Sequence, residues 1–177
     1  MATYSFDASQ LEDTRYSPIR QRNFQQAILL VVEDHEDVWA LLRFALTKAF
    51  PDIRVYRTSS RQDTIAFIQE GILNPAGLPK LILQDLYLPT KEDGLGLLKD
   101  IQTLLADYQQ IPTIVMSSSI NLTDIQQAYH FHASYYVVKP INMNRWLDFC
   151  QSLRQFWWDQ GILPFYTDTD QNGHESV

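Results

Sequence analysis

Short apolar runs alternate along this chain with longer segments in which apolar residues recur every three or four positions. The unbroken run at 28–32 is typical of a strand covered on both faces, and residues 38–49 are typical of an amphipathic helix. The same pairing repeats four times downstream, where the predicted strands are 53–56, 81–83, 113–116 and 135–138. Alternating strands and helices predict an α/β fold, a doubly wound five-stranded parallel sheet with helices on both faces.

Residues of the helix-capping types mark where several of these helices begin. Ser60 and Asp63 form a capping box before the second helix, and Asn142 precedes a last helix predicted to run to about residue 159. Asn121 and Thr123 are both candidate caps for the fourth helix. The predicted helix starts therefore fall between the predicted strands, as the alternation requires.

The two ends of the chain lack this periodicity. Polar residues dominate both ends, with apolar residues scattered between charges. We expect residues 1–26 to form a flexible N-terminal arm, 27–160 to fold as one domain, and 161–177 to form a flexible C-terminal tail.

Composition narrows the functional classes. Fourteen Lys and Arg residues against 21 Asp and Glu give a net charge of −7 without a basic patch, so we expect no nucleic-acid partner. No segment resembles a signal peptide or a membrane span, so we expect no membrane partner. The single cysteine, Cys150, cannot form an internal disulfide, fits the reducing cytoplasm and is expected to fill space in the core.

Polar side chains gather where the predicted strands end. Glu33 and Asp34 follow the first strand and Asp85 ends the third, and the carboxyl ends of parallel strands meet at one edge of the sheet. Clustered carboxylates repel one another unless a cation neutralises them, and oxygen ligands suit Mg²⁺. Serines 117–119 follow the fourth strand and Lys139 ends the fifth, which adds hydroxyls and an ammonium group at the same edge.

These groups form a set suited to phosphoryl transfer onto an aspartate. A metal ion and a lysine would neutralise charge on the phosphoryl oxygens, and a hydroxyl would orient one of them. Each feature alone has an ordinary explanation, because acidic runs favour helix N-termini, serines cap helices and Lys-Pro pairs mark loops. Their presence at the ends of different strands, in chain order, favours the chemical interpretation.

Five stretches carry a resemblance to a known family: LLVVED at 29–34, LILQDLYLP at 81–89, DGLGLL at 93–98, IPTIVMSSS at 111–119 and YYVVKP at 135–140. They resemble the CheY-like receiver domains of two-component response regulators over roughly residues 27–160. The resemblance implies a flavodoxin-like sheet with strand order 2-1-3-4-5. It also implies a protein that accepts a phosphoryl group from a sensor histidine kinase, catalysing its own transfer and slow dephosphorylation.

The resemblance assigns roles to individual residues. The corresponding residues are Asp85 for the phosphoacceptor; Glu33, Asp34, Asp85 and the backbone carbonyl of Tyr87 for Mg²⁺; Ser117 and Lys139 for catalysis; and Ser117 and Tyr136 for the conformational switch.

The sequence departs from the family pattern in two places. One extra residue lies between Pro89 and Asp93, and Tyr87 is larger than the usual asparagine. We expect the Tyr87 ring to lean toward the phosphate and obstruct the attacking water, so that the phosphoaspartate persists. Ser119 is too short and too weakly basic to act as a general base.

The last helix carries apolar residues at helical spacing, and we expect them to face the sheet. They are Trp146, Cys150, Leu153 and Trp157. Phe149 and Phe156 would then lie on the flank toward the fourth helix. A wide core stripe is the ordinary explanation, whereas exposed rings there would suit a homodimer or an effector contact. We favour a homodimer.

The chain has no room for an output domain after the fifth strand–helix unit, so we expect a stand-alone receiver acting on a separate effector protein. The segment WWDQGILP at 157–164 is similar to the end of single-domain regulators that partner cyanobacterial phytochromes. This similarity implies a kinase of the phytochrome type.

Three other functional classes share part of this pattern. A degenerate receiver would act as a phosphorylation-independent interaction module, and whether Asp85 accepts phosphate discriminates the two. A haloacid-dehalogenase-type phosphatase would need a second acid where Tyr87 stands. A flavin or dinucleotide module would need a glycine-rich turn after the first strand, and residues 33–38 contain no glycine.

Overall fold

The sheet is five-stranded and parallel, with the order β2-β1-β3-β4-β5, which confirms the expected fold class. The computed structural model describes residues 23–24, 27–74, 77–106, 108, 110–161 and 163. Its strands are β1 (Ile28–Val32), β2 (Arg54–Thr58), β3 (Leu81–Asp85), β4 (Thr113–Ser117) and β5 (Tyr135–Val138). Its helices are α2 (Glu36–Ala49), α3 (Arg61–Leu73), α4 (Lys91–Leu104), α5 (Leu122–His130) and α6 (Met143–Leu153).

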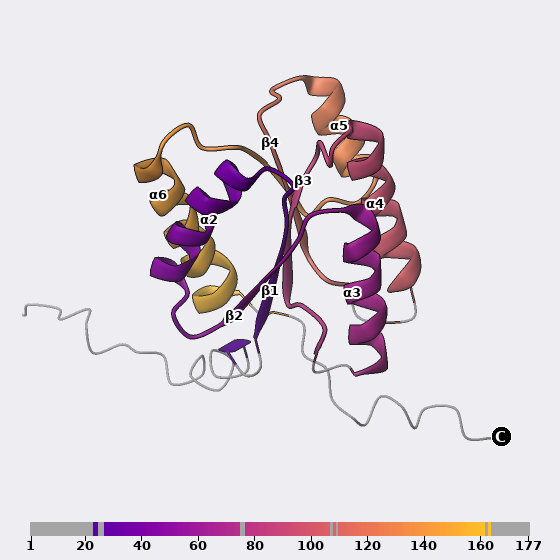
Figure 1. Ribbon diagram of the computed structural model, residues 1–177, viewed down its shortest axis with the longest axis horizontal. Coiled ribbons are helices and arrows are strands. Elements are labelled where there is room, and N and C mark those ends of the chain that lie inside the picture. Colours follow the sequence, from indigo (N-terminus) through magenta and orange to yellow (C-terminus); the bar gives the residue numbers. More distant parts are fainter. Residues whose placement is uncertain are drawn as a thin grey trace, which may run out of the picture.

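Helices cover both faces of the sheet, with α2 and α6 on one face and α3, α4 and α5 on the other (Figure 1). The three central strands are buried along their whole length, whereas β2 and β5 form partly exposed edges. This burial explains why the central strands are continuous apolar runs. Within the described ranges, no helix is both long and apolar enough to cross a membrane.

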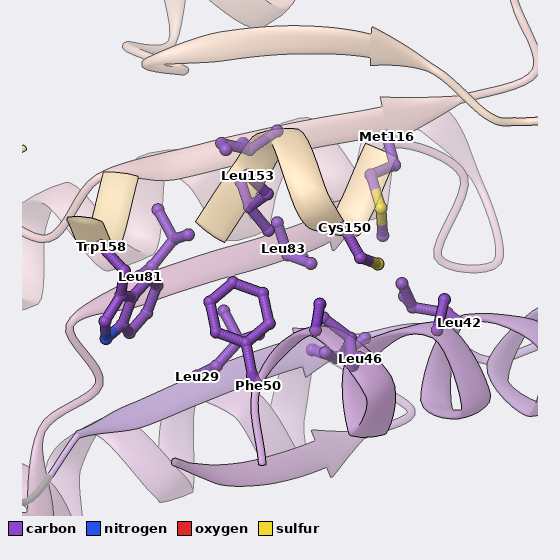
Figure 2. Close-up of a cluster of buried hydrophobic side chains, with 14 of the residues drawn as sticks. Leu29, Leu42, Leu46, Phe50, Leu81, Leu83, Met116, Cys150, Leu153 and Trp158 are labelled. Atoms are coloured by element: carbon purple, nitrogen blue, oxygen red, sulfur yellow. The ribbon is translucent and has the colours of Figure 1, made fainter. Parts of the chain in front are cut away.

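The core under α2 and α6 packs aliphatic side chains of the central strands against aliphatic and aromatic side chains of the helices (Figure 2). Leu29 and Leu81 point from the strands, and Phe50 meets Trp158 edge-on at a ring-centroid distance of 5.1 Å. Cys150 is completely buried in this layer, as expected from the sequence, and burial raises the pKa of its thiol to about 12. The thiol therefore serves as a small apolar side chain.

Most helices begin with a side-chain cap. Ser60 accepts a hydrogen bond from the amide of Asp63, and Asn142 caps α6, both as predicted. Asn121, rather than Thr123, caps α5. Thr90 caps α4 in the same way, a cap that the sequence analysis did not identify.

The last helix changes its hydrogen-bonding pattern after Leu153. Residues Arg154–Gln160 form a π-helix, η3, which continues directly from α6. In a π-helix the backbone hydrogen bonds join residues five apart instead of four, so the residue that faces the core lies one position later in the sequence than in an α-helix. The predicted register is therefore wrong at its end, since Trp158 is fully buried while Trp157 is only partly buried at the edge of the core.

The beginning of the described chain packs against this π-helix. Asn23 is 1% exposed, and its side-chain amide donates to the carbonyls of Trp158 and Gly161, both at 2.7 Å. Its carbonyl oxygen accepts from the amide of Leu163 at 3.0 Å. Asn23 and Leu163 fall in the predicted arm and tail, whose remaining residues lie almost entirely outside the described ranges.

Candidate functional site

An acidic cluster lies at the carboxyl ends of the two central strands β1 and β3. The register pairs Val32 with Gln84, so that the next residues along each strand, Glu33 and Asp85, become neighbours. One ligand atom from each of Glu33, Asp34, His35 and Asp85 lies within 4.8 Å of the other three. The topology therefore brings together three carboxylates that the sequence predicted at this edge, together with an imidazole that it did not.

Lys139 joins two of these carboxylates from the end of β5. Its Nζ donates to Oδ2 of Asp85 at 2.7 Å and to Oε2 of Glu33 at 2.8 Å. Burial raises the pKa of Glu33 above its usual value, and the bond and charge of Lys139 act in the opposite direction. The ammonium group thus partly offsets the cost of holding buried carboxylates together.

The donor set fits a hard divalent cation. Carboxylate oxygens are the preferred protein ligands of Mg²⁺, and Asp34 is only partly buried, which leaves the cluster open to solvent on one side. His35 holds Asp34 through a contact of 2.8 Å between Nδ1 and Oδ1. The amide of Tyr87 donates to Oδ1 of Asp85 at 3.2 Å, so the loop after β3 orients the same carboxylate.

Arg57, at the end of the edge strand β2, fixes the backbone of the acidic pair. Its guanidinium donates to the carbonyl of Glu33 at 2.9 Å and to that of Asp34 at 3.3 Å, and it pairs with Glu36 at 2.7 Å. The same group lies over the ring of Trp39. Sequence reasoning missed this residue, because an arginine in an edge strand carries no local signal of such a contact.

Ser117 and Tyr136, the predicted switch pair, are connected through Ser119. The Ser117 side chain is buried, and its Oγ accepts from the amide of Ser119 at 3.1 Å. Tyr136 lies inward with 9% of its surface exposed, and its hydroxyl donates to the carbonyl of Ser119 at 2.9 Å. The structure therefore places one residue, Ser119, between the two.

The sequence profile of the response regulator receiver domain matches residues 29–151. The chain belongs to this family. Response regulator Rcp1 of Synechocystis sp. is 30% identical to this receiver over 138 residues, which cover 77% of this chain and 92% of Rcp1.

Solved structures of related receivers superpose on most of the chain. The Mn²⁺-bound form of Rcp1 is 29% identical, with a TM-score of 0.67 over 78% of this chain and 99% of that one. The phosphorylated cyanobacterial phytochrome response regulator RcpA is also 29% identical, with a TM-score of 0.69 and the same coverage.

Tyr87 of this receiver does not project freely into solvent. Its ring is partly covered, with 40% of the residue exposed, and its hydroxyl donates to Oδ2 of Asp124 at 3.0 Å. Asp124 belongs to the first turn of α5, and it also accepts from Ser119 and from Lys91. Neither Asp124 nor Lys91 was singled out from the sequence, because an acid in a first helical turn is ordinary.

The two predicted interface residues of the receiver differ in exposure. Phe156 is 66% exposed, whereas Phe149 is partly buried and packs against the core beside Trp146. Both line a groove of about 960 Å³ between β5 and α6. Tyr135 and Ile141 are further exposed apolar residues along it.

Proposed function

We propose that this receiver accepts a phosphoryl group on Asp85 from the phosphohistidine of a sensor histidine kinase. The observation that carries the proposal is the position of Lys139, whose ammonium contacts Asp85 and Glu33 together inside the acidic cluster. The kinase is proposed to be of the phytochrome type, because the relatives include a phytochrome response regulator at 29% identity.

The transfer is a single displacement at phosphorus. An oxygen of the Asp85 carboxylate forms the new bond, and the phosphorus–nitrogen bond of the phosphohistidine breaks, with its electron pair passing to the imidazole. Lys139 offsets charge on the phosphoryl oxygens, and the hydroxyl of Ser117, which follows the β4 partner of Asp85, is proposed to donate to one of them. The amide of Tyr87 holds the carboxylate in place.

Glu33, Asp34, Asp85 and the backbone carbonyl of Tyr87 would hold Mg²⁺. When bound, the ion supplies positive charge that neutralises the carboxylates and the incoming phosphoryl oxygens. Arg57 keeps the backbone of Glu33 and Asp34 in position for this role.

We further propose that Ser117 and Tyr136 relay the phosphorylation state to a separate effector protein. A phosphoryl group that engages the Ser117 hydroxyl favours one arrangement of the loop that ends at α5. Tyr136 senses this loop because its hydroxyl bonds to the carbonyl of Ser119. Ser117→Ala is expected to leave Asp85 able to accept phosphate while effector affinity no longer rises. An unaltered rise in effector affinity would contradict the relay.

The face along β5 and α6, where Phe156 is exposed and Phe149 is partly buried, is proposed as a homodimer contact. The groove between β5 and α6 is lined largely by apolar side chains. A second copy of the chain bound there would remove this apolar surface from water. Sedimentation with and without a phosphoryl mimic tests this, and Phe156→Ser should weaken association. A monomer at every concentration would refute it.

The phosphoacceptor is tested with a small phosphodonor, Mg²⁺ and intact mass. Wild type should gain one phosphoryl group that maps to Asp85, and Asp85→Asn should gain none. Asp37→Asn is the matched control, since Asp37 is an exposed carboxylate in the first turn of α2. Equal labelling of Asp85→Asn would refute the assignment, and an unlabelled wild type would favour the degenerate receiver.

A further inference from the structure

The carboxylate of Asp124 joins the loop that begins α5 to the segment between β3 and α4, more than 30 residues away in the sequence. It is 4% exposed and accepts from Oγ of Ser119 at 2.7 Å, the hydroxyl of Tyr87 at 3.0 Å and Nζ of Lys91 at 3.1 Å. These donors come from the loop before α5, the loop after β3 and the first residue of α4. The hydrogen bond from Ser119, together with those from Lys91 and Tyr87, lowers the pKa of Asp124, whereas burial alone would raise it. The charged form of the carboxylate is therefore favoured.

Helix capping does not explain this carboxylate. Asn121 is the cap of α5, and its side chain accepts from the amide of Thr123. Asp124 instead receives all three of its hydrogen bonds from side chains outside the helix. A buried charge is costly unless it is paired, so the position suits a residue that holds other side chains in place.

Two of the donors lead directly to the proposed phosphorylation site. Tyr87 contacts Asp85 through its amide at 3.2 Å and Asp124 through its hydroxyl, so this one residue extends from the phosphoacceptor to α5. Ser119 contacts Ser117 through its amide and Tyr136 through its carbonyl.

We propose that Asp124 is a positioning residue that holds the Tyr87 ring beside a phosphoryl group on Asp85 and thereby slows its hydrolysis. The inference rests on the proposed function of Asp85. Tyr87 is held at two points, by its amide on Asp85 and by its hydroxyl on Asp124. A ring held in this way would hinder the water that must approach phosphorus in line with the departing oxygen. The same carboxylate fixes Ser119, so that the inward Tyr136 keeps its hydrogen bond.

The size of the effect follows from the hydrogen bond that is lost. The hydrogen bond from the Tyr87 hydroxyl to a carboxylate is strong. Because Tyr87 is partly exposed, however, its hydroxyl forms hydrogen bonds to water when it is released. We therefore expect release of the ring to speed phosphate loss by about five- to tenfold.

The test measures first-order loss of phosphate from purified phosphorylated protein in Mg²⁺, followed by intact mass. Asp124→Asn retains the size of the side chain but removes its charge, and Tyr87→Phe retains the ring but removes its hydroxyl. Each should speed the loss, and the double variant should be no faster than either single variant, because both remove the same contact. Asp37→Asn is the control and should match wild type.

Unchanged rates in both single variants, or effects that add in the double variant, would overturn the proposal. A second measurement requires no phosphate and separates this inference from the proposed function. In protein labelled with fluorotyrosine, the ¹⁹F signal of Tyr87 is assigned by its loss in Tyr87→Phe. Asp124→Asn should move that signal toward the position of a solvent-exposed tyrosine. A signal that does not move would overturn the inference whether or not Asp85 accepts phosphate.

Discussion

Replacing Asn23 with alanine should destabilise the domain, although the residue lies outside the predicted core. The substitution removes two hydrogen bonds of 2.7 Å to backbone carbonyls and one of 3.0 Å from a backbone amide. Two of these partners belong to Trp158 and Leu163, which are buried, and the third belongs to the partly exposed Gly161. The bond from the Trp158 indole to the backbone carbonyl of Asn23 does not depend on the side chain.

The expected cost follows from this geometry. A buried backbone group left without a partner costs about 1–3 kcal/mol, and water is able to replace the lost bond at Gly161. We expect Asn23→Ala to lower the free energy of unfolding by about 2–4 kcal/mol. At about 2–4 °C per kcal/mol for a domain of this size, the melting temperature should fall by about 4–16 °C.

Urea unfolding followed by tryptophan fluorescence measures the loss, and Asn144→Ala on the exposed face of α6 is the matched control. Asn23→Asp keeps the shape but replaces the two amide donors with a carboxylate oxygen facing two carbonyl oxygens. It should therefore be at least as destabilising at neutral pH. A free energy of unfolding within about 0.5 kcal/mol of wild type for Asn23→Ala would refute this reasoning, as would a fully stable Asn23→Asp.

Three further predictions concern the core and the site. A methyl group at Gly94 would overlap the carbonyl of Leu86. Gly94→Ala should therefore lower the free energy of unfolding, measured in urea, by about 1–3 kcal/mol. It should also slow phosphorylation, because it displaces the loop after β3. Cys150, with its buried thiol at a pKa of about 12, should react with thiol reagents at neutral pH only as fast as the protein unfolds, and immediate reaction would contradict its placement. The pKa of Glu33 is raised, so its contribution to stability is present below its unfolded value of 4.5 and is lost as pH rises through the folded value. We therefore expect the melting temperature of Glu33→Gln, measured without divalent cations, to exceed that of wild type at about pH 7. Below about pH 4 the two melting temperatures should be equal. Lys139 retains its bond to Asp85 in this variant.

The sheet and the acidic cluster were predictable from the sequence for one reason. In a parallel sheet the strand order determines which strand ends are neighbours, and each of these strands carries its polar residue at the same end. Asp85 and Lys139 lie 54 residues apart in the chain, and the topology alone places them at the same end of the sheet, with one strand between them.

The contacts that were missed depend on side chains meeting between elements. Arg57 looks like a charged residue on an edge strand, and its role becomes visible only when the guanidinium meets the carbonyls of Glu33 and Asp34. Asp124 looks like an ordinary acid in a first helical turn, and its contact with Tyr87 becomes visible only when that residue reaches it from another loop. Such pairings leave no periodic signal in the chain.

The error at the end of the last helix has a different origin. The helical spacing predicts Trp157 in the core, because a regular α-helix repeats every 3.6 residues. Adjacent tryptophans make either register chemically acceptable, so the pattern of apolar residues does not distinguish them. The burial of Trp158 follows from the π-helical segment, which is a matter of backbone hydrogen bonding.

The π-helix also affects which changes in chain length this part of the receiver tolerates. One residue more than an α-helix would use separates Leu153 from Trp158, so the segment behaves as a helix that has absorbed a single-residue insertion. Deleting one residue between them, such as the exposed Gln155, would restore α-helical spacing and leave the same indole ring in the core. Adding a residue there would instead rotate that ring away from Phe50 and move the carbonyls that Asn23 binds. The end of the receiver should thus accept shortening by one position far better than lengthening by one.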